Sequence, residues 1–292
     1  MGHFPVSLRL HQAQNKVVAI GKFHELVITR LVEFGAYLDA HEGDEVLIPG
    51  KYLPENAAVG DALRVFVYPD SKDRPVATTE QPFAQEGEYA CLTVVDANHL
   101  GAFLHLGLTK HLLVPFREQA RPMQPNEQHV VRIGADPRTN RLIGTSRFSA
   151  FFNKGTSSLQ VGQAVNLLVY QITDIAYKVI IDHQFTGLLY RNEVFQPLHY
   201  GQAVKGFIKQ VREDGKVDVA LQAQGYQAVA TAEEQLMAAI TQASGFLPLT
   251  DKSDPDDIKQ QLQMSKKTFK KAVGALYKKQ LIALEANGLR KV

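Results

Sequence analysis

Cations recur at one place, and aromatic side chains stand at several related places, in the first three-quarters of this 292-residue chain. The rings are Phe34, Tyr37, Phe103 and Tyr190, and the basic residues, each just before an apolar segment, are Arg74, Arg141 and Lys216. Every base has an apolar face, so an exposed ring can stack on it while a nearby cation neutralises phosphate. The chemistry that these residue types offer together is the binding of single-stranded nucleic acid.

The places of these residues follow from an internal repeat. Four landmarks fall at 34, 49, 60 and 74, at 100, 115, 126 and 141, and at 175, 190, 201 and 216. The steps are therefore 15, 11 and 14 residues in the first copy and 15, 11 and 15 in the other two. A connector rich in Gly, Ser and Thr, at 151–158, accounts for the longer second period.

Each copy has the pattern of a small β unit. Segments 90–95 and 165–170 are rich in β-branched and aromatic residues, which predicts strands. Asp136-Pro137 and Asp214-Gly215 are turn signals between the last two strands of their copies. Five short strands in about 65 residues fit a closed barrel of the OB type, whose second and third strands bind oligonucleotides.

The last quarter changes to helical periodicity. A helix is predicted over 232–242, a second begins at Pro255 after a cap at Ser253 or Asp254, and a third begins after Ser265. Asn287-Gly288 predicts a hairpin turn. This order is that of a winged helix-turn-helix, which usually sets its last helix in a DNA groove and also serves as an RNA or protein module.

The predicted fold class is therefore multidomain β plus α. Three tandem OB-type barrels are expected at 1–82, 83–154 and 155–226, followed by a winged helix-turn-helix at 227–292. Six lysines and no acid lie between 264 and 280. Such a cluster is either an electrostatic footprint for phosphate or a solvated helix face.

These features carry a family resemblance. The repeats resemble the ribosomal S-one (S1) RNA-binding domain, with its Phe-Gly-Ala-Phe strand, Leu-Val-His turn, Val-Gly-Asp step and basic residue before the closing strand. Three such repeats with a winged helix resemble the bacterial conserved virulence factor B family (CvfB/YitL-like). Three longer phrases, at 187–195, 245–252 and 264–272, support this likeness, which covers essentially the whole chain. It implies a cytoplasmic RNA-binding protein that regulates gene expression and virulence and has no catalytic activity.

The resemblance also implies which residues contact RNA. In S1 domains two strand aromatics and a turn histidine form a stacking platform, and the histidine position here holds Pro49, Pro115 and Tyr190. His105, two residues after Phe103, is expected on the same strand face. The predicted RNA-binding residues are Phe34, Tyr37, Arg74, Phe103, His105, Arg141, Lys178, Tyr190, Lys216, Lys266, Lys267, Lys270 and Lys271.

Composition narrows the class of protein. A hydrophobic share of 45% excludes a mostly disordered chain. No apolar run approaches the roughly 18 residues of a membrane span, and 1–10 lack the apolar region of a signal peptide. A single cysteine, Cys91, excludes a disulfide framework. We therefore expect a cytoplasmic protein that contacts no membrane and, since barrel closure removes exposed strand edges, a monomer.

The sequence predicts neither catalysis nor a cofactor. It has no glycine-rich phosphate loop. His99, His105 and His111 are spaced by six residues without a cysteine or carboxylate cluster, so no metal site is expected. Cys91 lies in an apolar strand and is interpreted as a small hydrophobic residue rather than a nucleophile.

Three hypotheses remain for the partner. The first is single-stranded RNA, U-rich or weakly specific, bound mainly by copies two and three and the winged helix, because copy one holds 8 basic and 11 acidic residues. The second is DNA, with the winged helix of a transcription regulator as the reader. The third is a scaffold on the ribosome or a polymerase. For individual residues, the alternative is core packing for Phe34 and Phe103 and a solvated hairpin tip for Arg74, Arg141 and Lys216.

Overall fold

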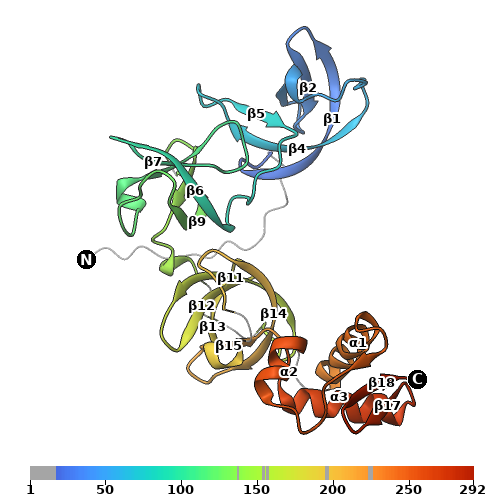
Figure 1. Cartoon of the computed structure of the whole chain (residues 1–292). Coiled ribbons are helices and arrows are strands. Elements are labelled where there is room, and N and C mark those ends of the chain that lie inside the picture. Colours follow the sequence, from blue (N-terminus) through green and yellow to red (C-terminus); the bar gives the residue numbers. More distant parts are fainter. Residues whose placement is uncertain (1–17, 137, 153–154, 156–157, 195–196, 223–225) are drawn as a thin grey trace. The chain divides into compact units, whose positions relative to one another are not determined.

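The computed structural model describes residues 18–292 except 137, 153–154, 156–157, 195–196 and 223–225. Two expectations concern residues outside this range: the absence of a signal peptide at 1–10, and the turn at Asp136-Pro137, of which Pro137 is not described. The chain divides into two compact units, 1–148 and 149–292. The first unit contains two β-barrels, and the second contains a third barrel and the C-terminal helices (Figure 1).

Each of the three barrels is closed by five strands, which confirms the predicted fold class. The first comprises β1 (Lys22–Val32), β2 (Gly35–Asp39), β3 (Glu45–Pro49), β4 (Ala62–Pro69) and β5 (Pro75–Thr78). The second comprises β6 (Tyr89–Asn98), β7 (Gly101–Leu104), β8 (Leu112–Pro115), β9 (Gln128–Ala135) and β10 (Leu142–Thr145). The third comprises β11 (Ala164–Ile172), β12 (Ala176–Ile181), β13 (Phe185–Tyr190), β14 (Ala203–Val211) and β15 (Val217–Ala220).

The barrels share one topology, in which the third strand pairs in parallel with the fifth and the other pairs are antiparallel. A short 3-10 turn follows the third strand of each: η1 (Gly50–Tyr52), η2 (Phe116–Glu118) and η4 (Arg191–Glu193). A further turn, η3 (Ser149–Phe151), follows the second barrel. The first strand of every barrel carries a register shift at the same place, between 28 and 30, 94 and 96, and 169 and 171.

The repeated landmarks have a shared physical cause. At the third landmark Gly60, Asn126 and Gly201 adopt positive φ, and their N–H groups donate to the first strand at distances of 2.8 to 2.9 Å. The side chain that follows each accepts a hydrogen bond from the N–H three residues earlier, as Asp61 does from Ala58 at 2.8 Å. Every copy therefore uses a residue with left-handed backbone and an acceptor side chain before its fourth strand.

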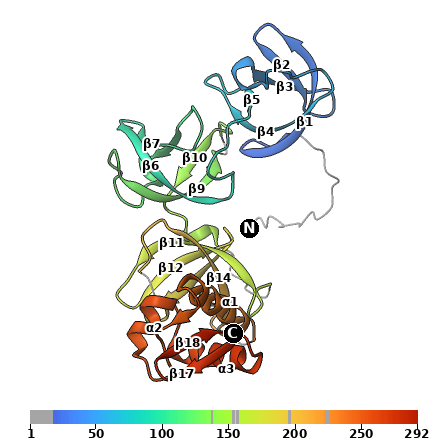
Figure 2. The ribbon, with the colours of Figure 1, turned by 45° about the vertical axis from the view of Figure 1, so that its right-hand side comes forward.

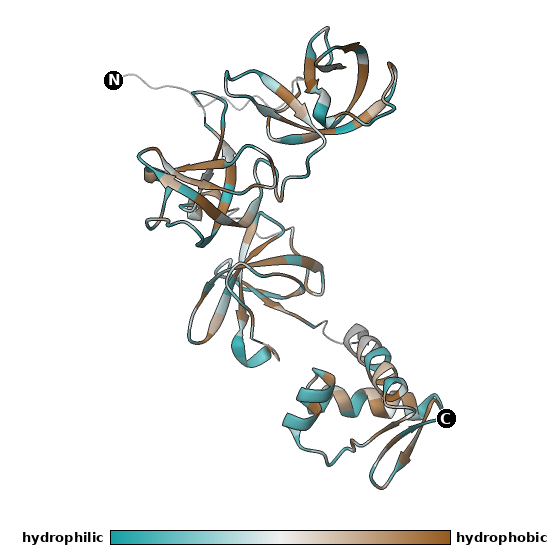
Figure 3. Ribbon diagram, turned by 45° about the horizontal axis from the view of Figure 1, so that its top comes forward, coloured by the Kyte–Doolittle hydropathy of each residue, from teal (hydrophilic) through white to brown (hydrophobic). Residues whose placement is uncertain are grey.

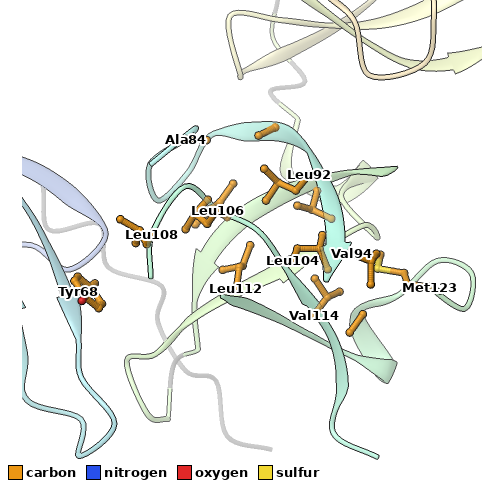
Figure 4. Close-up of a cluster of buried hydrophobic side chains, with 14 of the residues drawn as sticks. Tyr68, Ala84, Leu92, Val94, Leu104, Leu106, Leu108, Leu112, Val114 and Met123 are labelled. Atoms are coloured by element: carbon orange, nitrogen blue, oxygen red, sulfur yellow. The ribbon is translucent and has the colours of Figure 1, made fainter. Parts of the chain in front are cut away.

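Period-two alternation decides which side chains enter the barrels. In β7 Ala102 and Leu104 are fully buried, whereas Phe103 between them is half-buried. In β2 Ala36 and Leu38 are fully buried and Tyr37 is half-buried. Figure 4 shows Leu92, Val94, Leu104, Leu112 and Val114 gathered within the second barrel. The rings of Tyr37 and Phe103 therefore lie on the outer side of the sheet, so Phe103 does not fill the core.

The C-terminal domain contains three helices and a small sheet (Figure 2). Its elements are α1 (Tyr226–Gln242), β16 (Phe246–Leu247), α2 (Pro255–Leu262), α3 (Lys266–Lys278), β17 (Ile282–Glu285) and β18 (Gly288–Lys291). Asp254, rather than Ser253, caps α2 by accepting from the N–H of Asp256. Ser265 caps α3 by accepting from the N–H of Thr268. Hydrophobic residues lie along the strands and buried helix faces, and hydrophilic residues cover the outer faces of α2 and the loops (Figure 3).

Candidate nucleic-acid interface

The first platform position exposes a large apolar side chain in every barrel. Phe34, Leu100 and Ile175 are 60%, 54% and 71% exposed, each directly before the second strand. Core packing, the alternative considered for Phe34, is therefore excluded. Single exposed apolar residues are ordinary on protein surfaces. The three copies thus share one position at which a large apolar side chain is exposed.

Strand pairing places the second strand position of the platform and its turn position on one outer face of the sheet. Gly35 lies opposite Pro49 and Tyr37 opposite Leu47, so the Tyr37 and Pro49 side chains share a face of the sheet. The same register holds for Phe103 and Pro115 in the second barrel and for Lys178 and Tyr190 in the third. All six of these side chains are half-buried, with one side open to solvent.

In the first barrel an arginine that the sequence did not single out covers one ring. The guanidinium of Arg30 lies 3.7 Å from the centroid of the Tyr37 ring and donates to Glu45 at 2.8 Å. These hydrogen bonds lower the pKa of the Glu45 carboxyl. Arg30 and Tyr37 are cross-strand neighbours on β1 and β2. The Arg30 guanidinium is thus held against the Tyr37 ring, where it can stack on a base and contact a phosphate.

In the second barrel the platform positions line a cavity of about 340 Å³. Its walls include Leu100, Phe103 and Pro115 from the platform, and Tyr68 from the first barrel. The volume falls in the range of small-molecule sites, so a flipped-out base fits its scale. Lys110 closes one side: its Nζ donates to the carbonyl oxygens of residues 69 and 70, and burial lowers its pKa.

A second, shallower cavity of about 380 Å³ lies on the corresponding face of the first barrel. Pro49, Tyr52 and Arg74 line it. Tyr68 and Lys110 line both cavities, which therefore adjoin where the first two barrels meet.

The three predicted hairpin cations occupy one structural position. A backbone hydrogen bond of 2.8 Å closes each hairpin at Arg74, Arg141 and Lys216. Arg74 and Lys216 are exposed and form ion pairs with Asp70 and Asp214 at 2.7 Å, so both are hairpin-tip residues. Arg141 instead reaches from the second barrel to Asp73 of the first. Exposed pairs of this kind contribute at most about 1 kcal/mol, so phosphate can replace the carboxylate.

The third barrel fixes its aromatic residue through a buried acid. Arg212 forms a bidentate pair with Asp218, which is buried, and its Nη2 also donates to the Tyr190 hydroxyl at 2.6 Å. Both partners raise the pKa of Arg212. This network holds the Tyr190 ring at the platform's third position. Sequence reasoning missed Arg212 because only strand pairing brings it near Tyr190.

His105 is not on a strand face as expected. β7 ends at Leu104, and His105 is exposed on the loop that follows. It does not line the cavity; its ring centroid lies 6.0 Å from that of His111, which does. Among the described residues no group of three potential metal ligands gathers. Burial raises the pKa of the Cys91 thiol, which agrees with its interpretation as a hydrophobic residue.

The winged helix presents a basic face along α3. Phe269, Ala272, Val273 and Leu276 are buried, and the opposite face exposes Lys267, Lys270, Lys271, Tyr277 and Lys278. We call these five exposed residues the α3 stripe. Lys266 is half-buried instead, because its Nζ donates to the Ser253 carbonyl at 2.7 Å. The stripe follows helical spacing.

Tandem OB barrels with outward platforms, followed by a winged helix with a basic helix face, define a multidomain protein of the nucleic-acid-binding class. Among the helices that the structure describes, none has the length and apolar character needed to cross a membrane.

Comparison with known proteins gives matches at both ends of the chain and over most of its length. Residues 234–290 match the CvfB-like winged helix domain, and residues 20–80 match the S1 domain. It is 29% identical to YitL of Bacillus subtilis over 87% of each chain. It is 22% identical to conserved virulence factor B of Staphylococcus saprophyticus over 94% of this chain and 95% of the other. A Streptococcus pneumoniae structure described as a multidomain protein with nucleic acid binding domains is 22% identical over 94% and 98% of the chains, with a TM-score of 0.39.

Proposed function

We propose that this protein binds single-stranded RNA in the bacterial cytoplasm and regulates gene expression without catalysing a reaction. One observation carries the proposal. Each barrel exposes a large apolar side chain at the same position, beside the outer face of its second and third strands. Stacking on such faces tolerates any base, so the expected specificity is weak, with U-rich RNA as the first candidate.

Linked barrels raise the affinity further. Each platform lacks the full set of rings, so a single barrel binds weakly. When one barrel of the monomer has bound an RNA, the other barrels bind the same RNA intramolecularly, which increases the overall affinity. We propose barrel boundaries at 82, 154 and 226; every barrel strand lies within one of these segments, and α1 begins at Tyr226.

A gel-shift titration of the full chain with single-stranded oligouridine tests the proposal. We expect binding at low salt that weakens as salt rises, because phosphate contacts release counterions. A perfectly paired RNA duplex of the same length serves as the control ligand and should bind more weakly. Absence of binding at low salt, or binding that ignores salt, refutes the proposal.

The α3 stripe favours a second candidate, duplex DNA bound by the winged helix. Changing Lys266, Lys267, Lys270 and Lys271 together to Glu then abolishes duplex binding and spares single-stranded RNA binding. If the quadruple variant binds duplex DNA as the wild type does, this candidate is wrong.

A further inference from the structure

The second barrel carries a group of exposed rings outside its platform. Phe83, from the linker before β6, is 63% exposed, and its ring centroid lies 5.5 Å from that of His105 at an interplanar angle of 83°. The His105 ring in turn lies 6.0 Å from His111 at 79°. We call Phe83, His105 and His111 the ring cluster. Because His111 lines the 340 Å³ cavity, the cluster begins where the platform ends.

The backbone holds these rings in place. The N–H of Phe83 donates to the carbonyl of Leu106 at 2.8 Å, which ties the linker to the β7–β8 loop. Leu106 and Leu108 anchor the same loop in the barrel core. Gly107 permits the close approach, since it has a φ of +91° and a Cβ there would lie 2.9 Å from the Gln81 carbonyl oxygen. The rings are therefore exposed on a fixed surface, which reduces the entropy lost on binding.

The other barrels have no such cluster at the corresponding positions. The first two landmarks are 15 residues apart in every copy, so His105 and His111 correspond to Asp39 and Glu45 in the first barrel. Carboxylates there repel phosphate. In the third barrel the corresponding residues are Ile180, which is buried, and Thr186. Ring-bearing residues at both positions are thus particular to the second barrel.

We propose that the ring cluster extends the nucleic-acid site of the second barrel, so that bases leaving the cavity stack on His111, His105 and Phe83. The ligand is single-stranded nucleic acid longer than the platform alone can hold. Edge-to-face rings leave ring faces open, and an open ring face accepts any base. The inference rests on the proposed function, because it lengthens that site.

The test compares the double variant Phe83→Ala/His105→Ala with wild type, using oligouridines of about 4 and about 16 nucleotides, the limits of OB-fold site sizes. Affinity for the long oligomer should fall about fivefold or more, the effect of losing at least one stacked base. Affinity for the short oligomer should not change. The control variant, Val161→Ala/His199→Ala, removes exposed side chains from the third barrel and should bind both as wild type does.

The outcomes separate the two claims. If wild type binds both oligomers and the double variant binds them equally well, the ring cluster is not part of the site. If affinity for both lengths falls by the same factor, the cluster supports the platform and does not extend it, which also overturns the inference. If wild type binds neither oligomer, the proposed function itself fails. Unchanged thermal unfolding of the double variant ties any loss to the exposed rings.

Discussion

The α3 stripe allows the contribution of the winged helix to be counted in phosphate contacts. Lys267, Lys270 and Lys271 are exposed on one helix face, and the only ion pair among them in the described structure is the 4.0 Å contact of Lys270 with Asp251. Each lysine is therefore available to one phosphate. If the stripe contacts single-stranded RNA, the slope of log affinity against log salt should become shallower by about 2 in the variant Lys267→Gln/Lys270→Gln/Lys271→Gln, since each contact to a single strand contributes about 0.7.

On duplex DNA the slope of log affinity against log salt should change by about 2.7, because each duplex contact contributes about 0.9. Fluorescence anisotropy titrations at several salt concentrations measure both slopes. The Gln substitutions keep the helix, since Gln has nearly the helix propensity of Lys. Lys205→Gln, an exposed change on β14, is the control and should leave the slope as it is. A triple variant with wild-type slopes on both ligands would refute the assignment of the stripe to phosphate binding.

Three further predictions follow from individual side chains. Phe34→Ala removes one exposed stacking surface and should lower oligouridine affinity about fivefold in an anisotropy titration, an effect of about 1 kcal/mol; unchanged affinity would remove the first barrel from the binding site. Phe269→Ala empties the fully buried centre of the winged helix and should destabilise that domain by about 3–5 kcal/mol in calorimetry, and a loss below about 1 kcal/mol would contradict this core assignment. The backbone N–H and the guanidinium of Arg74 lower the pKa of Asp70 from 3.8 to about 2, so the stabilisation from this carboxylate is present above about pH 4 and is lost as the pH falls to about 2. Asp70→Asn should therefore flatten the fall of the urea unfolding midpoint with pH in that window. An unchanged fall would show that the pair of Asp70 and Arg74 does not contribute to stability.

The barrels could be predicted from sequence because their constraints are local. Each copy needs a residue that tolerates positive φ at the third landmark and, directly after it, an acceptor side chain. The spacing of the landmarks is therefore the same even where the residue types differ, as at Asn126. The winged helix was predictable for the same reason, since Ser265 and the buried Phe269 lie within two turns of each other.

The contents of the site were less predictable because they depend on strand register and on contacts between barrels. Arg30 reaches Tyr37 across two strands, and Arg141 finds Asp73 68 residues earlier in the chain. The sequence carries no distance information for such pairs. His105 was misplaced for a related reason: β7 ends one residue before it, and strand ends are not marked by residue type.

The central claim is that the outer faces of the second and third strands hold single-stranded RNA. Photo-crosslinking of a thiouridine-substituted oligonucleotide to the full chain, followed by peptide mapping, tests it most directly. We expect crosslinks in the segments 34–49, 100–115 and 175–190, which hold the second and third strands of the three barrels. Crosslinks confined to the winged helix, or spread over the fourth and fifth strands instead, would contradict it.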